Sequence, residues 1–293
     1  IIAAYRAIPM LQNVYTNINL YKFYQPIFCI IEDLYKANKI DINTKKNKDK
    51  LEFKKQIVFK NINFSYKNQQ QIITNLNCKI DHGKITALIG ATGSGKTSLI
   101  DILLGFYKPS SGSIIIDDVE LTKYEQSNFN KNIGYVTQSV NLQQNTIAEN
   151  IALGIPKDEI NITKVNQILK VVELDCLVEK LENGVHTNIG DRGTKLSGGQ
   201  RQRIGIARAL YSTPDLLIFD ESTNELDAAT ETKILKNIRL YLPNVTIIMI
   251  THRLSSLKHA DKILLFRRNG IEDVAISNHQ KIGNLEDIID INR

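Results

Sequence analysis

One eight-residue segment constrains the fold of this 293-residue chain more than any other. Residues 90–97 read Gly-Ala-Thr-Gly-Ser-Gly-Lys-Thr and match the pattern G-x-x-x-x-G-K-[ST]. The strand-like apolar run 84–89 precedes this segment, and the helical pattern 96–104 follows it. Glycines let the backbone fold around a phosphate with its N–H groups pointing inward, and the start of the helix adds a field that favours anions. The segment therefore predicts a phosphate-binding loop between a strand and a helix.

The side chains of this loop have specific expected roles. Lys96 is placed to reach β- and γ-phosphates, and the Thr97 hydroxyl is placed to ligate Mg²⁺. The alternative is a chance glycine-rich turn, which leaves the flanking strand and helix unexplained. The residues expected to contact a nucleotide here are Gly90, Ala91, Thr92, Gly93, Ser94, Gly95, Lys96, Thr97 and Ser98.

A second segment, 216–221, has four apolar residues followed by Asp220 and Glu221. A buried strand that delivers an aspartate at its carboxyl end is the second half of a phosphate-binding fold, in which Asp220 helps to hold Mg²⁺. Glu221 is then placed to polarise an attacking water as a general base. Taken alone, the segment is better explained as a strand that ends in a solvated acidic turn. The loop at 90–97 makes the catalytic interpretation the better one.

Strand and helix patterns alternate from about residue 52 onward, which predicts an α/β domain with a largely parallel sheet. The expected strands are 57–64, 84–89, 113–116, 216–219, 245–250 and 263–266. The expected helices are 96–104, 146–153, 162–172, 199–211 and 228–241.

A third motif decides the family. Leu196-Ser197-Gly198-Gly199-Gln200 is a glycine-rich loop at the start of a helix, which is another anion-binding geometry. Together with the loop at 90–97 and the acidic strand, it resembles the signature sequence of the ABC transporter ATPases, and the resemblance covers residues 53–293. It implies a P-loop NTPase sheet of the ABC type, an antiparallel β subdomain and an inserted helical subdomain at about residues 139–200.

Further residues match elements of this family. Tyr66 resembles the aromatic residue that stacks on adenine, and Gln138 resembles the glutamine that reaches Mg²⁺, the water and the transmembrane partner. His252 follows a strand and resembles the switch histidine that contacts the γ-phosphate. Asp227 lies in the D-loop position, where Asn224-Glu225 departs from the usual Ser-Ala. The alternatives are an ordinary strand aromatic for Tyr66, a surface residue for Gln138 and a structural histidine for His252.

The resemblance implies a composite site. In the family, two chains pack head to tail, so that Ser197 and Gly199 of one chain complete the ATP site built on Lys96 of the other. The implied cofactors are ATP and Mg²⁺, and the implied partners are a second ATPase domain and a transmembrane domain of the same polypeptide. Because Glu221 and an intact signature occur on one chain, a homodimer is favoured.

Two segments resemble those of exporters in particular. Residues 187–193 resemble the X-loop that meets the intracellular coupling helices, with Asp191 in place of the usual glutamate, and residues 146–151 resemble the T-I-x-x-N-I segment. Residues 4–9 are similar to bacterial lipid-linked oligosaccharide flippases; lipid, peptide and drug exporters remain as alternatives. The transported substrate, and whether the partner is identical, stay open.

The N-terminal part of the chain has a different sequence pattern from the ATPase-like part. Residues 1–38 show helical periodicity, and Pro9 and Pro26 are expected to break or kink the helix. We interpret them as the cytoplasmic end of a last transmembrane helix with its connecting helix, and 39–52 as a basic linker. No apolar run of 18 or more residues occurs, so we expect no segment of this sequence to span a membrane unaided. The sequence opens Ile1-Ile2 without a methionine, so we expect it to be the C-terminal part of a longer protein, at the cytoplasmic face of the cell membrane.

The charge of +6 comes from one segment, because residues 36–60 contain nine lysines and three acidic residues. The rest of the chain is neutral, so we expect no nucleic-acid partner. The competing hypothesis is a soluble ABC-type clamp that acts on nucleic acid or ribosomes, and only this basic segment supports it. A degenerate regulatory subunit is a third hypothesis, which intact Lys96, Asp220, Glu221 and His252 oppose. The three cysteines are widely spaced and predict neither a disulfide nor a metal site.

Overall fold

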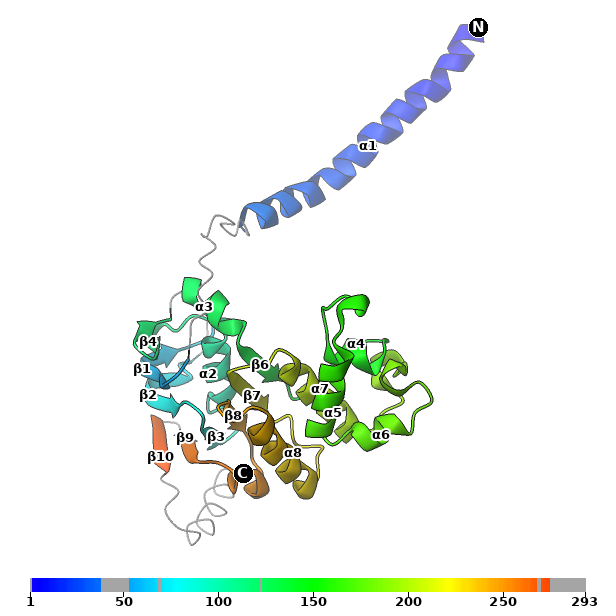
Figure 1. The fold of residues 1–293 in the computed structure, drawn as a ribbon. Helices are drawn as coiled ribbons and strands as arrows, with labels where there is room; N and C mark the ends of the chain where they lie inside the picture. Colours follow the sequence, from blue (N-terminus) through cyan, green and yellow to red (C-terminus); the bar gives the residue numbers. More distant parts are fainter. Residues whose placement is uncertain (1, 38–52, 68–69, 122, 268–269, 275–293) are drawn as a thin grey trace. The chain divides into compact units, whose positions relative to one another are not determined.

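The computed structural model describes residues 2–37, 53–67, 70–121, 123–267 and 270–274 (Figure 1). The chain divides into two units, Ile1–Lys48 and Asp49–Arg293, each of which is described by itself. The whole of the expected linker, 39–52, and the C-terminal residues 275–293 lie outside the described residues.

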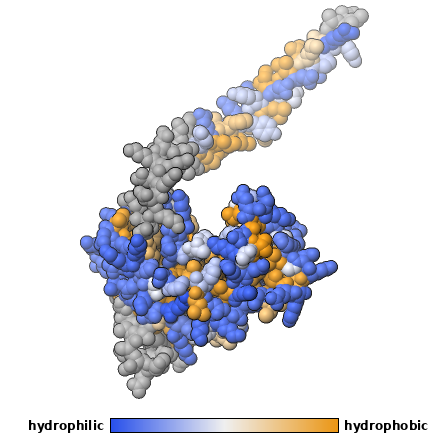
Figure 2. Space-filling model, viewed as in Figure 1, coloured by the Kyte–Doolittle hydropathy of each residue, from blue (hydrophilic) through white to orange (hydrophobic). Residues whose placement is uncertain are grey.

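The first unit contains one helix, α1 (Ile2–Ala37). The expected break at the prolines is wrong, because α1 continues through both Pro9 and Pro26. Each proline removes a single i→i−4 hydrogen bond, and the many bonds of the flanking turns maintain the helix. The large apolar side chains of α1 are exposed from Tyr5 to Tyr35 (Figure 2). None of the helices in the described parts of the chain has an apolar stretch of membrane-spanning length.

The second unit contains all ten strands of the described residues, and these form two sheets. The strands are β1 (Gln56–Phe64), β2 (Ile73–Asp81), β3 (Ile85–Gly90), β4 (Ser111–Ile116), β5 (Val119–Glu120), β6 (Ile133–Val136), β7 (Leu216–Asp220), β8 (Thr246–Ile250), β9 (Lys262–Arg267) and β10 (Gly270–Val274). The first sheet is antiparallel, with the order β2-β1-β4-β5. The second has the order β10-β9-β3-β8-β7-β6 and is parallel except for β10 at its edge. All six expected strands are confirmed, whereas β2, β5, β6 and β10 were not expected.

The helices of this unit connect the strands and cover the second sheet. They are α2 (Lys96–Leu103), α3 (Lys123–Asn130), α4 (Ile147–Ile151), α5 (Ile162–Val171), α6 (Asp175–Glu179), α7 (Gly198–Tyr211), α8 (Ala228–Tyr241) and α9 (Leu254–Leu257), with 3₁₀ turns η1 (Lys157–Glu159), η2 (Gly184–His186) and η3 (Asp191–Gly193). The five expected helices are confirmed. The chain between β6 and β7 contains α4 to α7 and no strand among its residues, all of which the structure describes.

The six-stranded sheet is the middle layer of the unit. Alternate side chains of its buried strands point to opposite faces, as the twofold periodicity of a strand requires. On β7, Leu216 and Ile218 face the core shared with α2 and the antiparallel sheet. Leu217 and Phe219 face a second core shared with α5, α7 and α8. Buried strands of this kind are continuously apolar, which explains why their sequences are uninterrupted runs of apolar residues.

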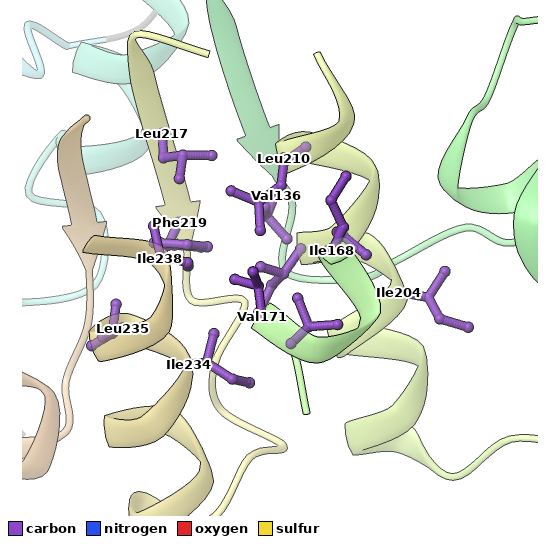
Figure 3. Packing of buried hydrophobic residues seen from close by; sticks show 14 of the residues in the cluster. Val136, Ile168, Val171, Ile204, Leu210, Leu217, Phe219, Ile234, Leu235 and Ile238 are labelled. Atoms are coloured by element: carbon purple, nitrogen blue, oxygen red, sulfur yellow. The ribbon is translucent and has the colours of Figure 1, made fainter. Parts of the chain in front are cut away.

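The second core joins the helices between β6 and β7 to the sheet. Side chains from β6, β7, α5, α7 and α8 converge there (Figure 3). Ile168 of α5 is fully buried in this cluster. Apolar packing therefore anchors the helical region to the sheet.

Replacement of Ile168 by alanine tests this anchoring. We expect Ile168→Ala to lower the free energy of unfolding by about 2–5 kcal/mol, because it removes buried methyl groups and leaves a cavity. Leu240→Ala is the matched control, since Leu240 of α8 is 77% exposed, and it should change stability by less than about 0.5 kcal/mol. Urea unfolding measures both values, and similar losses for the two variants would contradict the packing described.

Candidate functional site

The glycine-rich loop connects the centre of the sheet to a helix. β3 lies between β8 and β9 and ends at Gly90, and α2 begins at Lys96. Gly90 has φ 144°, and a Cβ there would lie 2.4 Å from the Phe266 carbonyl oxygen of β9, so only glycine fits. Gly95 caps α2 with φ 96° and, being glycine, makes no side-chain cap hydrogen bond to the first turn of this helix. The loop has the backbone geometry of an anion site.

Lys96 lies within this loop with its amine directed to the backbone. Its Nζ donates to the carbonyl oxygens of Gly90 at 2.7 Å and Ala91 at 2.9 Å. Burial lowers the pKa of Lys96 from its ordinary value, whereas the charges of Glu221 and Asp220 oppose that change. The buried Ser94 hydroxyl has no hydrogen-bond partner in the structure. A phosphate would provide acceptors for both side chains.

A cavity of about 220 Å³ opens beside the loop. It brings together residues that are distant in sequence, namely Tyr66, Thr92, Gly93, Gly95, Lys96, Thr97, Ser98, Glu221 and His252, with Ile72. The Tyr66 hydroxyl and the Ser98 hydroxyl are 3.1 Å apart. The Tyr66 ring packs edge-on against Phe64 and Tyr107, which holds an aromatic surface at the cavity wall.

Asp220 ends β7 at the same edge of the sheet. Burial raises the pKa of Asp220, and the hydrogen bond from Tyr135 opposes this shift. The Tyr135 hydroxyl donates to Asp220 Oδ2 at 3.0 Å. Tyr135 was not expected as a site residue. The signal that could have found it is its place on β6, which pairs in parallel with β7 and puts Tyr135 beside Ile218.

Glu221 is contacted from both sides by the other two expected catalytic residues. Gln138 Nε2 donates to Glu221 Oε2 at 3.3 Å, and His252 Nε2 lies 3.3 Å from Glu221 Oε1. Glu221 has a left-handed backbone conformation with φ 50°, which is uncommon for this residue type. Its N–H donates to the Ile250 carbonyl oxygen at 3.1 Å, which connects it to the end of β8. The carboxylate is thus fixed between two polar side chains at the cavity.

The signature residues Ser197, Gly198, Gly199 and Gln200 are not among the described residues that line this cavity. Ser197 caps α7, accepting from the N–H of Gln200, while the Gln200 side chain accepts from the N–H of Ser197. Asp227 also lies outside the cavity lining. Its carboxylate caps α8 by accepting from the Thr230 N–H at 2.9 Å, and hydrogen bonds with Thr230 lower the pKa of Asp227.

The two exporter-like segments lie side by side. Thr146 and Asn188 form an isolated antiparallel bridge, and the Ile147 N–H donates to the Thr187 carbonyl oxygen at 3.1 Å. Thr146 caps α4 in a reciprocal pair with Glu149. The two segments are therefore direct neighbours in the helical region, where Ile147, Ile151 and Ile189 are buried.

The expected magnesium ligands provide suitable chemistry. The Thr97 hydroxyl, the Gln138 amide and the Asp220 carboxylate are hard oxygen groups of the kind that Mg²⁺ prefers. Among the described residues, no group of three or more His, Cys, Asp or Glu side chains is arranged to hold a metal.

Comparisons with known proteins agree with this geometry. The family model described as "ABC transporter" matches residues 73–224. A Rickettsia conorii protein named as an export ATP-binding/permease protein is 36% identical over 234 residues, which are 79% of this chain and 40% of that protein. An "ATP-dependent lipid A-core flippase" of Wigglesworthia glossinidia brevipalpis is 39% identical over 228 residues, 78% of this chain and 39% of the flippase.

A solved structure supports the same assignment. The structure of a bacterial Atm1-family ABC exporter with ATP bound aligns with a TM-score of 0.78 and 29% identity, covering 93% of this chain and 47% of the exporter. The chain spans about two fifths of the length of the curated relatives named above. It belongs to the ABC transporter family. Its fold and motifs are those of the ATP-binding and ATP-hydrolysing domain of an exporter.

Two glycines of the loop provide a test of its geometry. We expect Gly90→Ala to lower the free energy of unfolding by about 2 kcal/mol or more, because the new Cβ would collide with the β9 backbone. Gly93→Ala is the matched control: Gly93 also has a positive φ, but a Cβ there would meet nothing within 4 Å. Gly93→Ala should lower the free energy of unfolding by only about 1–2 kcal/mol, which is the cost of placing alanine in a left-handed backbone conformation. Denaturant unfolding measures the two values, and a larger loss for Gly93→Ala would refute the assigned loop geometry.

Proposed function

We propose that two copies of this chain bind two ATP molecules between them and that hydrolysis powers an exporter of an amphipathic lipid. One observation carries the proposal. Lys96, Glu221 and His252 line the cavity of one chain, whereas Ser197–Gln200 are not among the described residues that line it. A second copy placed head to tail supplies the missing motif to each site, and the resulting interface is isologous.

The phosphates bind at the loop. The N–H groups at the start of α2, the Lys96 amine and the Ser94 hydroxyl provide donors, and Tyr66 provides a face for the adenine. Thr97, Gln138 and Asp220 would hold Mg²⁺, which neutralises the phosphate charge when bound. The Tyr135 hydroxyl orients the Asp220 carboxylate for this task.

Glu221 acts as the general base. Its carboxylate accepts a proton from the attacking water, while Gln138 and His252 fix its position from either side. His252 also contacts the γ-phosphate, so it links the base to the bond that breaks. Removal of the γ-phosphate takes away contacts that held the two copies closed, and the dimer then opens.

The movement is transmitted through a surface of the helical region. Gln138 and residues 187–193 contact the membrane domain, and the neighbouring segment 146–151 supports them. The export ATP-binding/permease proteins among the relatives support a membrane domain in the same polypeptide. In this proposal, residues 1–38 connect to that domain, 39–52 form a basic linker, and 53–293 form the ATPase at the cytoplasmic face of the cell membrane.

The lipid substrate is supported by relatives named as lipid A-core flippases. A narrower prediction is that the transported lipid is a lipid-linked oligosaccharide, and it rests on the similarity of residues 4–9 to bacterial flippases of that class. The competing hypothesis of a nucleic-acid clamp is supported by the basic segment 36–60 alone.

Glu221→Gln tests the catalytic role. The variant keeps the shape of the side chain but cannot take a proton, so we expect it to bind ATP, to turn over at least about 100-fold more slowly, and to accumulate as a dimer with Mg-ATP. A phosphate-release assay and size-exclusion chromatography measure these properties. Hydrolysis near the rate of the unmodified chain would contradict the assignment.

Lys96→Ala tests the loop. We expect ATP affinity to fall at least about tenfold, a loss of about 1.4 kcal/mol or more, because the variant lacks a charge-assisted donor to the phosphates. Equilibrium binding of a fluorescent ATP analogue measures this change, with the exposed Lys236 of α8 replaced by alanine as the control. Equal affinity of Lys96→Ala and the unmodified chain would count against the phosphate-binding role.

A further inference from the structure

Arg253 directly follows His252, and its guanidinium enters the turn that follows Glu221. Nη1 of Arg253 donates to the Thr223 carbonyl oxygen at 2.9 Å and to the Leu226 carbonyl oxygen at 2.7 Å. The Leu226 N–H donates to the same Thr223 oxygen at 3.0 Å. The turn 222–226 is therefore closed by its own backbone and by a side chain from the end of β8.

A buried carboxylate holds the guanidinium in this place. Glu231 of α8 is only 2% exposed, and its Oε1 accepts from the Ser256 hydroxyl at 2.7 Å. Its Oε2 has no hydrogen-bond partner among the residues that the structure describes and lies 3.7 Å from Arg253 Nη1. A carboxylate removed from water needs a paired charge, so the positions of Glu231 and Arg253 depend on each other.

The same turn packs directly on the start of α7. The Glu225 N–H donates to Gln202 Oε1 at 3.0 Å, and Gln202 is buried. A Cβ at Gly199 would lie 3.1 Å from the Glu225 carbonyl oxygen, and one at Gly198 would collide with the Glu225 carboxylate. The glycines of the signature are thus in close contact with the turn that Arg253 closes.

We propose that Arg253, fixed by Glu231, is a positioning residue that joins the switch histidine to the turn 222–226 and, through this turn, to the signature of the same chain. This inference rests on the proposed function. A displacement of His252 by the γ-phosphate moves Arg253, the turn and the surface offered to the second copy together. ATP bound at the loop of one chain thereby sets the geometry of that chain's signature, which completes the ATP site of the second copy.

Two chemical features explain why arginine suits this position. Its Nη1 carries two N–H groups in the fixed plane of the guanidinium, and these bond the carbonyl oxygens of Thr223 and Leu226, while its charge does not depend on pH in the working range. Lysine has the charge, but its amine ends a flexible stem and has no fixed plane of donors. We therefore expect Arg253→Lys to pair with Glu231 and still to hold the turn less well than arginine.

The experiment separates positioning from stability with the double variant Arg253→Met/Glu231→Gln, which we call the neutral pair because it removes both charges. In the Glu221→Gln chain, Arg253→Met leaves the Glu231 charge buried alone, and we expect a lower melting temperature. Adding Glu231→Gln removes that charge and should return the melting temperature close to that of the Glu221→Gln parent. The bonds to Thr223 and Leu226 remain absent in the double replacement. The readouts are thermal unfolding, ATP binding, and dimer formation with Mg-ATP by analytical ultracentrifugation.

We expect the neutral pair to bind ATP with the affinity of the parent, because Lys96 and the loop are unchanged. The protein concentration that gives half-dimerisation should rise about tenfold or more, and amide hydrogen exchange at 222–226 should accelerate. Arg239→Ala, at the far end of α8, is the matched control, since Arg239 pairs with Asp261 and should leave dimerisation as in the parent.

The outcomes are distinguishable. A neutral pair that regains dimerisation together with its melting temperature overturns the inference and leaves the proposed function intact. A Glu221→Gln parent that binds ATP and stays monomeric overturns the proposed function, and the inference with it. Reduced dimerisation with restored stability and unchanged ATP affinity supports Arg253 as the positioning residue.

Discussion

The site depends on the parallel pairing of β3, β8 and β7, because the carboxyl ends of parallel strands meet at one edge of the sheet. The register aligns Leu88 of β3 with Ile250 of β8, and Ile250 in turn with Asp220 of β7. The residues that follow these three positions are the glycine-rich loop, His252 and Glu221. A single set of backbone hydrogen bonds therefore brings together the glycine-rich loop, His252 and Glu221. This agrees with the rule that open α/β sheets bind ligands at the carboxyl ends of their strands.

In our proposal, the ATPase site is divided between two surfaces of each chain, and this division gives ATP its mechanical role. A ligand changes a conformational equilibrium only by binding one state better than another. In our proposal, ATP contacts the loop of one copy and the signature of the other, so it stabilises only the closed arrangement. The contact between turn 222–226 and the signature adds a connection inside each chain. The Glu225 carboxylate, in a position where the family usually has alanine, lies against Gly198 in this connection.

Much of the fold and the site was predictable because the decisive signals are local. The loop at 90–97 needs only a strand, glycines at positive φ and a helix, and all of these occur within about twenty residues. Asp220, Glu221 and His252 follow apolar runs that only a buried strand explains. β2 was harder to predict because its asparagines and charged residues weaken the apolar alternation, and β6 was harder because it has only four residues.

The features that the sequence did not predict depend on long-range contacts or on a balance of many weak interactions. Tyr135 contacts Asp220 only because β6 pairs with β7, and Glu231 meets Arg253 only once α8 packs beside the end of β8. No local pattern indicates either pairing. The continuity of α1 through Pro9 and Pro26 reflects the sum of its many backbone bonds against the loss at two positions.

The most direct test of the central claim uses two defective chains in the Glu221→Gln background. One carries Lys96→Ala, and the other carries Ser197→Arg, which blocks the signature. Each is labelled with a different fluorophore, and energy transfer is measured on addition of Mg-ATP. If the sites are shared between copies, the mixture forms one intact composite site, and energy transfer should appear in the mixture while neither variant self-associates. Absence of ATP-dependent energy transfer in the mixture, with both variants folded and Ser197→Arg still binding ATP, would contradict the shared site.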